Sequence, residues 1–186
     1  MRIAAGPSDS RAMFFKTIVE SAATWLETAK ELHFAAEVIG KKHFGYLRAY
    51  ARGRPRRGRS GQREMAGRAG GVFLLLAGLA LENLAKSLYV LTHRPTVSDG
   101  KLPPDLKDHD IGLVLSRAKI EVTQREGEFL GKVSKAVTWS GRYSAPVGAK
   151  AMERVRVVTS LDDLSQFRAL FRRLEKEFQR RDRPAR

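Results

Sequence analysis

Residues 65–93 contain the segment that most constrains how this chain can fold. The apolar residues between positions 73 and 81 occupy every side of the helix that their spacing predicts; they are Phe73, Leu74, Leu75, Leu76, Ala77, Leu79, Ala80 and Leu81. A helix that is apolar on all sides is buried on all sides. We therefore predict a central helix over residues 65–93, surrounded by other helices. Gly78, in its middle, predicts a close crossing with one of them.

The N-terminal part of the chain has the pattern of a long amphipathic helix. Apolar residues recur every seven positions in two adjacent rows, one from Phe15 to Ala36 and the other from Ile18 to Ile39. This spacing predicts one helix that is capped by Ser10 and ends between positions 40 and 47. Such a row packs in a helical bundle or in a dimer seam, and the spacing alone does not separate the two.

Three further helices are predicted after the central one. Asp108 or Asp110 offers an N-cap for a short helix, and the sequence Thr123-Gln-Arg-Glu126 is a capping box. Ser160 is the expected N-cap of a final helix, whose apolar residues recur at alternating spacings of three and four. Residues 139–146 are interpreted as an irregular link. The predicted fold class is all-α, a bundle of about five helices.

The composition fits a single domain. The chain has 186 residues, and 42% of them are hydrophobic. We expect a helical domain over residues 10–178, with a flexible basic insertion at 48–70 and a basic tail at 179–186. The longest apolar run, residues 71–81, is shorter than the ~20 residues of a membrane span. We therefore expect a cytoplasmic protein with no membrane association.

The net charge of +15 is concentrated in two segments, the insertion and the C-terminus. Residues 48–68 contain eight arginines and one glutamate, interleaved with Gly, Pro and Ser, a composition that is typical of disordered chain. Guanidinium groups pair with phosphate, so this segment is a candidate nucleic-acid-binding site. The alternative is a solvated basic loop without a ligand. The candidate contacts are Arg52, Arg54, Arg56, Arg57 and Arg59.

Glu82 and Lys86 interrupt the most hydrophobic helix of the chain. They lie four residues apart on one face, and an unpaired buried charge is too costly to keep. We therefore predict that both are mostly buried and that Glu82 contacts His109 or Arg142. One interpretation is an internal ion pair that fixes the helix register. The other is a polar cleft that meets a ligand.

His109 and Arg142 are the candidate catalytic residues, with Tyr143 beside them. His109 begins the predicted third helix, where it is either a capping residue or a general acid/base. Arg142 and Tyr143 lie in the link, where Arg142 either caps carbonyl groups or faces the cleft. Cysteine is absent, and the four histidines lack the spacing of metal ligands, so no metal site is expected.

Three segments resemble the HEPN superfamily, whose name refers to nucleotide binding in higher eukaryotes and prokaryotes. They are Leu-Ala-Gly-Leu-Ala-Leu-Glu-Asn-Leu-Ala-Lys-Ser-Leu at 76–88, Lys-Asp-His-Asp-Ile at 107–111 and Trp-Ser-Gly-Arg-Tyr-Ser-Ala-Pro at 139–146. The resemblance covers residues 73–147, with 14–44 as the family's first long helix. It implies a compact helical bundle, frequent homodimerisation, and RNA cleavage or nucleotide handling. It also implies a toxin–antitoxin or phage-defence context, with a cognate antitoxin or defence protein as partner. We expect no cofactor.

The chain departs from the pattern of the ribonuclease members in one respect. Those members carry an Arg followed by four to six residues and a His, whereas no histidine of this chain has an Arg at that offset. Ser144 also stands where the family's turn has proline. We therefore expect binding of RNA or nucleotide phosphates without efficient catalysis. The alternatives are a metal-independent endoribonuclease with a rearranged Arg142/His109 pair and a purely structural interaction protein.

Overall fold

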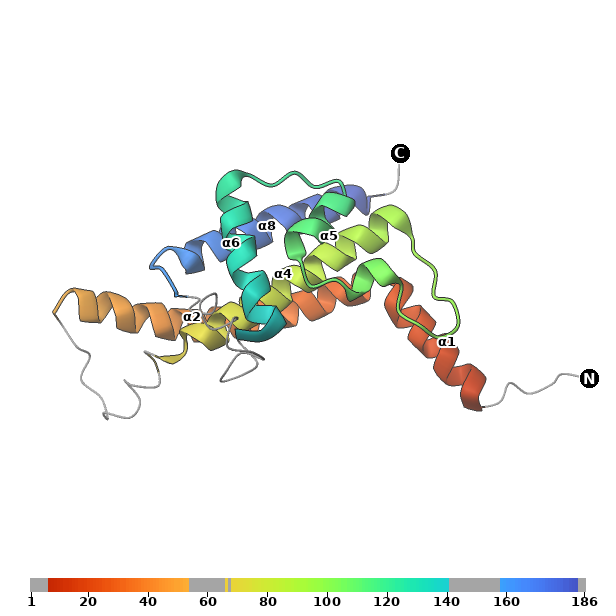
Figure 1. Ribbon diagram of the computed structural model, residues 1–186, viewed down its shortest axis with the longest axis horizontal. Helices are drawn as coiled ribbons and strands as arrows, with labels where there is room; N and C mark the ends of the chain where they lie inside the picture. The colour runs from red at the N-terminus through yellow and green to blue at the C-terminus, as the bar shows by residue number, and fades with distance from the viewer. Residues whose placement is uncertain (1–6, 54–65, 67, 141–157, 184–186) are drawn as a thin grey trace, which may run out of the picture.

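The structure, a computed structural model, describes residues 7–53, 66, 68–140 and 158–183 (Figure 1). The described residues form helices and contain no strand, which confirms the predicted all-α class. In chain order the helices are α1 (Pro7–Glu20), α2 (Ala22–Ala51), α4 (Gly70–His93), α5 (Ile111–Arg117), α6 (Gln124–Lys135) and α8 (Asp163–Arg181). A 3₁₀ turn, η1 (Pro104–Lys107), precedes α5, and a π-helical turn, η2 (Ala136–Ser140), extends α6.

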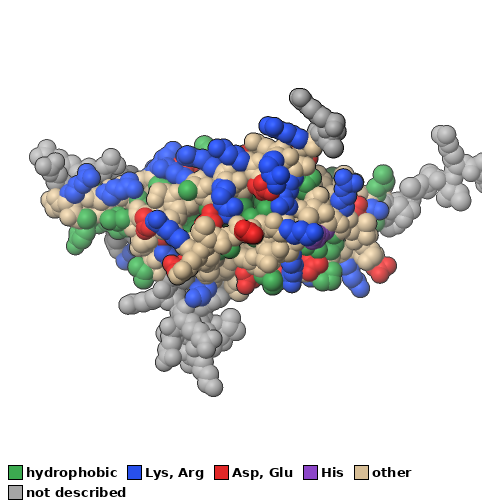
Figure 2. All heavy atoms as spheres, turned by 90° about the horizontal axis from the view of Figure 1, so that it is seen from above, with side chains coloured by type: hydrophobic (Ala, Val, Ile, Leu, Met, Phe, Trp, Pro, Cys, Tyr) green, Lys and Arg blue, Asp and Glu red, His purple; other side chains and the backbone are tan. Residues whose placement is uncertain are grey.

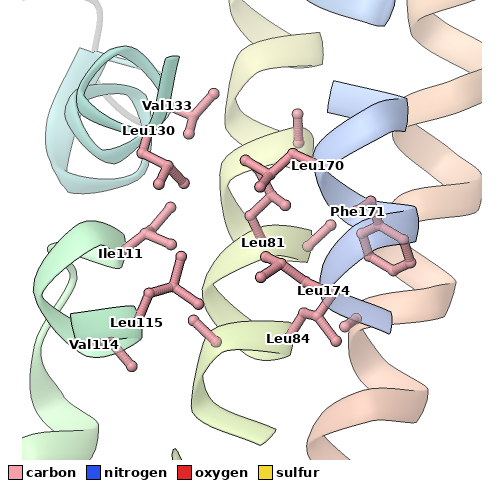
Figure 3. Close-up of a cluster of buried hydrophobic side chains, with 14 of the residues drawn as sticks. Leu81, Leu84, Ile111, Val114, Leu115, Leu130, Val133, Leu170, Phe171 and Leu174 are labelled. Carbon is pink, nitrogen blue, oxygen red and sulfur yellow. The ribbon is translucent and has the colours of Figure 1, made fainter. Parts of the chain in front are cut away.

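Helix α4 is the centre of the bundle, as its apolar pattern predicts. It packs along α2 on one side and against α5, α6 and α8 on the others. Figure 3 shows its side chains between those of three neighbouring helices. The cluster drawn there includes Leu81 and Leu84 of α4, Ile111, Val114 and Leu115 of α5, Leu130 and Val133 of α6, and Leu170, Phe171 and Leu174 of α8.

Gly78 lies where α4 crosses the end of α6. A Cβ atom at this position would lie 2.5 Å from Val137 Cγ2 and 2.8 Å from the carbonyl oxygen of Val133. Real Cβ atoms do not approach other atoms so closely, so only glycine fits this crossing. The predicted close approach at Gly78 is confirmed.

Helix α4 is also the one helix in the described part of the chain that is long and apolar enough to cross a membrane. However, 72% of its most apolar window is buried against the other helices. This burial is typical of the core helix of a soluble protein.

The predicted single N-terminal helix is wrong in one respect, because it is broken at Ser21. Ser21 has an extended backbone (φ −89°, ψ 106°), and its hydroxyl accepts a hydrogen bond from the N–H of Thr24 as the N-cap of α2. The apolar rows continue across the break, so periodicity could not locate it. Ser10 does not cap a helix either, since α1 already begins at Pro7, a residue favoured at a first helical position.

Helix α2 extends further than predicted and shortens the basic insertion. It continues to Ala51, so Arg48 and the three residues after it are helical, although the flexible segment was expected to start there. At the other end of the insertion, Gly70 already belongs to α4. Residues 54–65 and 67 lie outside the described residues.

The predicted start of α5 and the predicted capping box are confirmed. Asp110 caps α5 by accepting from the N–H of Leu113, and Thr123 and Glu126 form the reciprocal box that opens α6. The π-helical turn η2 takes up the first two residues of the predicted irregular link, and residues 141–157 lie outside the described chain.

The final helix starts and ends later than predicted. Its N-cap is Asp162 rather than Ser160, because Ser160 instead donates from its N–H and hydroxyl to the carboxylate of Asp163. At the other end, Arg181 is still helical, although a tail was expected from residue 179. Its guanidinium donates to the carbonyl oxygen of Ala118 and the hydroxyl of Thr92, which anchors this last turn on α5 and α4.

Candidate functional site

Glu82 and Lys86 form a buried ion pair on α4, as predicted. Each residue is only 4% exposed, and Lys86 Nζ donates to Glu82 Oε1 at 2.6 Å. The ammonium also lies 5.6 Å from the ring centroid of Trp25 on α2, a cation–π distance. The pair therefore has a hydrogen bond and an aromatic face in place of the water that burial removes.

His109 closes this cluster from the start of α5. Its Nδ1 lies 3.1 Å and 3.2 Å from the two carboxylate oxygens of Glu82, so the predicted contact between these residues is present. The two neighbours of His109 fix the backbone there. Asp108 accepts from the N–H of Asp110, and Asp110 caps α5. The imidazole is thus held between a buried carboxylate and a capped helix start.

The geometry gives the two ring nitrogens of His109 different roles. Nδ1 faces an acceptor and carries the proton, whereas Nε2 has no hydrogen-bond partner among the described residues. The side chain is 46% exposed, so Nε2 is open to a ligand. A carboxylate behind a histidine fixes the tautomer and the orientation of the ring. Such an imidazole can accept a proton from a hydroxyl or, once protonated, donate to a phosphate oxygen.

A polar network that the sequence did not reveal anchors the loop before His109. The hydroxyl of Tyr89 on α4 donates to Asp105 in η1 at 2.7 Å, and Arg117 of α5 bridges Asp105 and Asp108 at 3.4 Å and 3.2 Å. Burial and the hydrogen bond to Asp105 raise the pKa of Tyr89 to about 12. Tyr89 shares the helix face of Glu82 and Lys86. This shared face was the one feature of the sequence that pointed to a polar contact of Tyr89.

A basic groove lies between α8 and the connection from α5 to α6. Its volume is about 440 Å³, and its charged lining consists of Lys119, Arg173, Lys176, Arg180, Arg181, Glu121 and Glu177. Lys119 and Lys176 have no ion-pair partner within the described residues. Figure 2, which shows the molecule from above the view of Figure 1, has Lys and Arg side chains spread over this face with Asp and Glu side chains among them. The sequence predicted basic character at the C-terminus but not a groove.

The remaining predicted site residues are not brought together within the described chain. Arg142 and Tyr143, predicted to join the polar cluster, lie outside the described residues, as do Arg54, Arg56, Arg57 and Arg59 of the basic segment. Arg52 is described and is exposed at the C-cap of α2. The cluster that the structure describes is therefore Glu82, Lys86 and His109, with Trp25 as an unpredicted member.

Two other histidines, His43 and His33, make contacts within the helical bundle. His43 is buried, with Nδ1 2.9 Å from the carbonyl oxygen of Ala66 and Nε2 3.0 Å from the hydroxyl of Thr159. His33 contacts the rings of Phe167 and Phe171, and burial lowers its pKa. No group of three metal-ligating side chains occurs among the described residues.

No family model, curated protein or solved structure matches this chain.

Proposed function

We propose that this chain is a HEPN-like helical protein that binds RNA or nucleotide phosphates and does not cleave RNA efficiently. The observation that carries the proposal is the Glu82–His109 pair, which presents Nε2 of an oriented imidazole to solvent beside a buried ammonium. An imidazole held in this way donates to an anionic oxygen when it is protonated. Two of the three motifs of the resemblance, at 76–88 and 107–111, supply the members Glu82, Lys86 and His109 of this cluster.

The charge distribution supports the same class of ligand. The net charge of +15 attracts polyanions, and the described groove beside α8 places five cationic side chains around two acidic ones. Phosphate contacts by Lys and Arg give affinity without sequence preference and make that affinity salt-dependent. We therefore propose that Arg52 and the basic segment after it add phosphate affinity to the His109 site. The proposal places this function in the cytoplasm, in a toxin–antitoxin or phage-defence system.

A metal-independent endoribonuclease is the second candidate, and the orientation of His109 favours it. General acid/base catalysis needs a histidine of fixed tautomer and a cation close to the charge that develops on phosphate. Glu82 supplies the first requirement. Arg142 would supply the second, because Lys86 is committed to Glu82. The missing Arg-to-His spacing of the active relatives is the reason why we expect no efficient turnover.

A binding titration tests the main proposal. We expect single-stranded RNA to bind the full chain, and we expect His109→Gln to weaken binding because an uncharged amide replaces the imidazole that, when protonated, donates from Nε2 with a positive charge. His93→Gln is the matched control, since His93 is exposed at the C-terminal end of α4, the helix that carries Glu82 and Lys86. Equal affinities of the two variants would contradict a role for His109. Absence of RNA binding by the wild type would favour the purely structural interaction protein.

Incubation of the protein with a mixed RNA pool in chelator separates binding without efficient cleavage from endoribonuclease activity. We expect the RNA to stay intact. Cleavage that persists in chelator and is lost in both His109→Ala and Arg142→Ala would instead establish the endoribonuclease. Cleavage that survives both substitutions would come from another source, such as a contaminating nuclease.

A further inference from the structure

Helix α2 has an exposed face with an unusual order of side chains. The residues Glu27, Glu31, Phe34, Val38, Lys42 and Gly45 recur at spacings of three and four, so they form one stripe, which we call the α2 stripe. Phe34 is 72% exposed and Val38 is 41% exposed, whereas the opposite side of α2 is buried against α4. The stripe is thus acidic at its N-terminal end, apolar in the middle and basic at Lys42, towards its C-terminal end.

The charges of the α2 stripe have no partners within the described part of the chain. Glu27, Glu31 and Lys42 make no ion pair there, although Lys41, Glu37 and Lys30 beside the stripe do. A Cβ atom on Gly45 would meet nothing within 4 Å, so the backbone itself is open at this point. A second copy of the stripe that runs in the opposite direction is complementary to the first. Its basic end meets the acidic end of the first copy, and the two apolar centres meet each other.

We propose that the α2 stripe is a dimerisation surface and that its occupant is the α2 stripe of a second copy, packed antiparallel. A two-fold axis near position 36 places Phe34 opposite Val38 and Glu31 opposite Lys42 of the second copy. Glu27 then faces Gly45 and lies one helical turn from Lys42 of that copy. Each contact occurs twice, so both ends of the interface are neutralised while the apolar centre is buried.

The dimensions of α2 fit this arrangement. The stripe from Glu27 to Gly45 is about 27 Å long, and two helices in contact lie about 8–10 Å apart. Gly45 lets the facing backbone approach where Glu27 of the second copy arrives. A parallel arrangement would place Glu31 against Glu31 and Lys42 against Lys42, which is repulsive. The charge order therefore selects the antiparallel orientation.

Sedimentation equilibrium of the full chain, treated with nuclease, tests this inference independently of RNA binding. We expect a dimer at about 50 μM and a monomer for Phe34→Lys under the same conditions. Phe14→Lys is the matched control, because Phe14 is 69% exposed on α1 and should leave the dimer unchanged. A monomeric wild type, a dimeric Phe34→Lys, or dissociation by Phe14→Lys as well would overturn the proposal.

A charge exchange tests the antiparallel pairing. We expect Glu31→Lys and Lys42→Glu each to raise the dimer dissociation constant about tenfold or more, because each places like charges opposite each other. The double variant exchanges the charges and should recover most of the affinity. Failure of the double variant to recover would contradict the pairing of Glu31 with Lys42. Because these side chains are exposed, far-UV circular dichroism and melting temperature should match those of the wild type.

Discussion

Removal of Glu82 should destabilise the protein strongly, and the structure gives the size of the effect. The side chains of Glu82 and Lys86 are each 6% exposed, and their nitrogen and oxygen lie 2.6 Å apart. In Glu82→Ala the ammonium of Lys86 stays buried and keeps only the ring of Trp25. Breaking a buried pair from one side costs about 3–5 kcal/mol. This is a large part of the ~5–15 kcal/mol by which domains are stable.

Two further variants separate the charge effect from loss of packing. Glu82→Gln keeps an acceptor oxygen for Lys86 and His109, so we expect a smaller loss than in Glu82→Ala. The double variant Glu82→Leu with Lys86→Met removes both charges, so it should be about as stable as the wild type or more stable. Arg125→Ala is the control for an exposed ion pair, because Arg125 is 71% exposed where it meets Asp162, and it should cost less than about 1 kcal/mol.

Urea unfolding followed by far-UV circular dichroism measures these differences. A cost of Glu82→Ala no larger than that of Arg125→Ala would refute the stranded ammonium of Lys86 as the cause of the destabilisation. A double variant that is less stable than Glu82→Ala would refute it as well, because the loss would then arise from packing rather than from a stranded charge.

Three other predictions concern separate parts of the fold and are tested by thermal or acid denaturation. Gly78→Ala should destabilise the protein by about 1–3 kcal/mol, because the added methyl group overpacks against α6. Gly71→Ala, on the same helix, has open space and should stabilise the protein by up to about 1 kcal/mol. Equal effects of the two substitutions would contradict the close crossing at Gly78. Thr123→Ala removes half of the capping box and should cost about 1 kcal/mol, and no change would mean that the box is dispensable. Hydrogen bonds from Arg180 lower the pKa of Glu177 from its usual 4.5 to about 2. A carboxyl whose pKa is lower in the folded state stabilises the fold above its unfolded pKa, so this contribution should be lost as the pH falls from about 5 to about 2. Glu177→Gln should remove that part of the pH dependence, and an unchanged acid profile would contradict the assignment.

The sequence was sufficient to predict those features that follow from burial along one helix. Apolar residues on every side of residues 73–81 predicted the central position of α4, and two charges inside this pattern predicted a buried, paired Glu82 and Lys86. A charged side chain that is removed from water destabilises the fold unless it is paired, so this pairing can be predicted without knowledge of the neighbouring helices. The contact of Glu82 with His109 was predicted as one of two alternatives, the other being a contact with Arg142, because few polar side chains are expected near the cleft.

Features that depend on tertiary packing could not be predicted in this way. The break at Ser21 leaves the apolar rows in phase, so no change in periodicity marks it. The exposure of Phe34 and the groove beside α8 depend on which helix faces the neighbours cover. The cation–π contact of Trp25 with Lys86 joins residues from two helices, and neither helix shows it alone.

The salt dependence of RNA binding tests the proposed function most directly. Filter binding of single-stranded RNA to the wild type, between about 50 and 200 mM salt, should give a straight line of log affinity against log salt with a negative slope. Replacement of Arg52, Arg54, Arg56 and Arg57 by serine should flatten this slope by about 0.7 for each phosphate contact that is lost, with little change in melting temperature. An unchanged slope would show that these arginines do not contact phosphate. Absence of binding by the wild type even at the lowest salt would contradict the account as a whole.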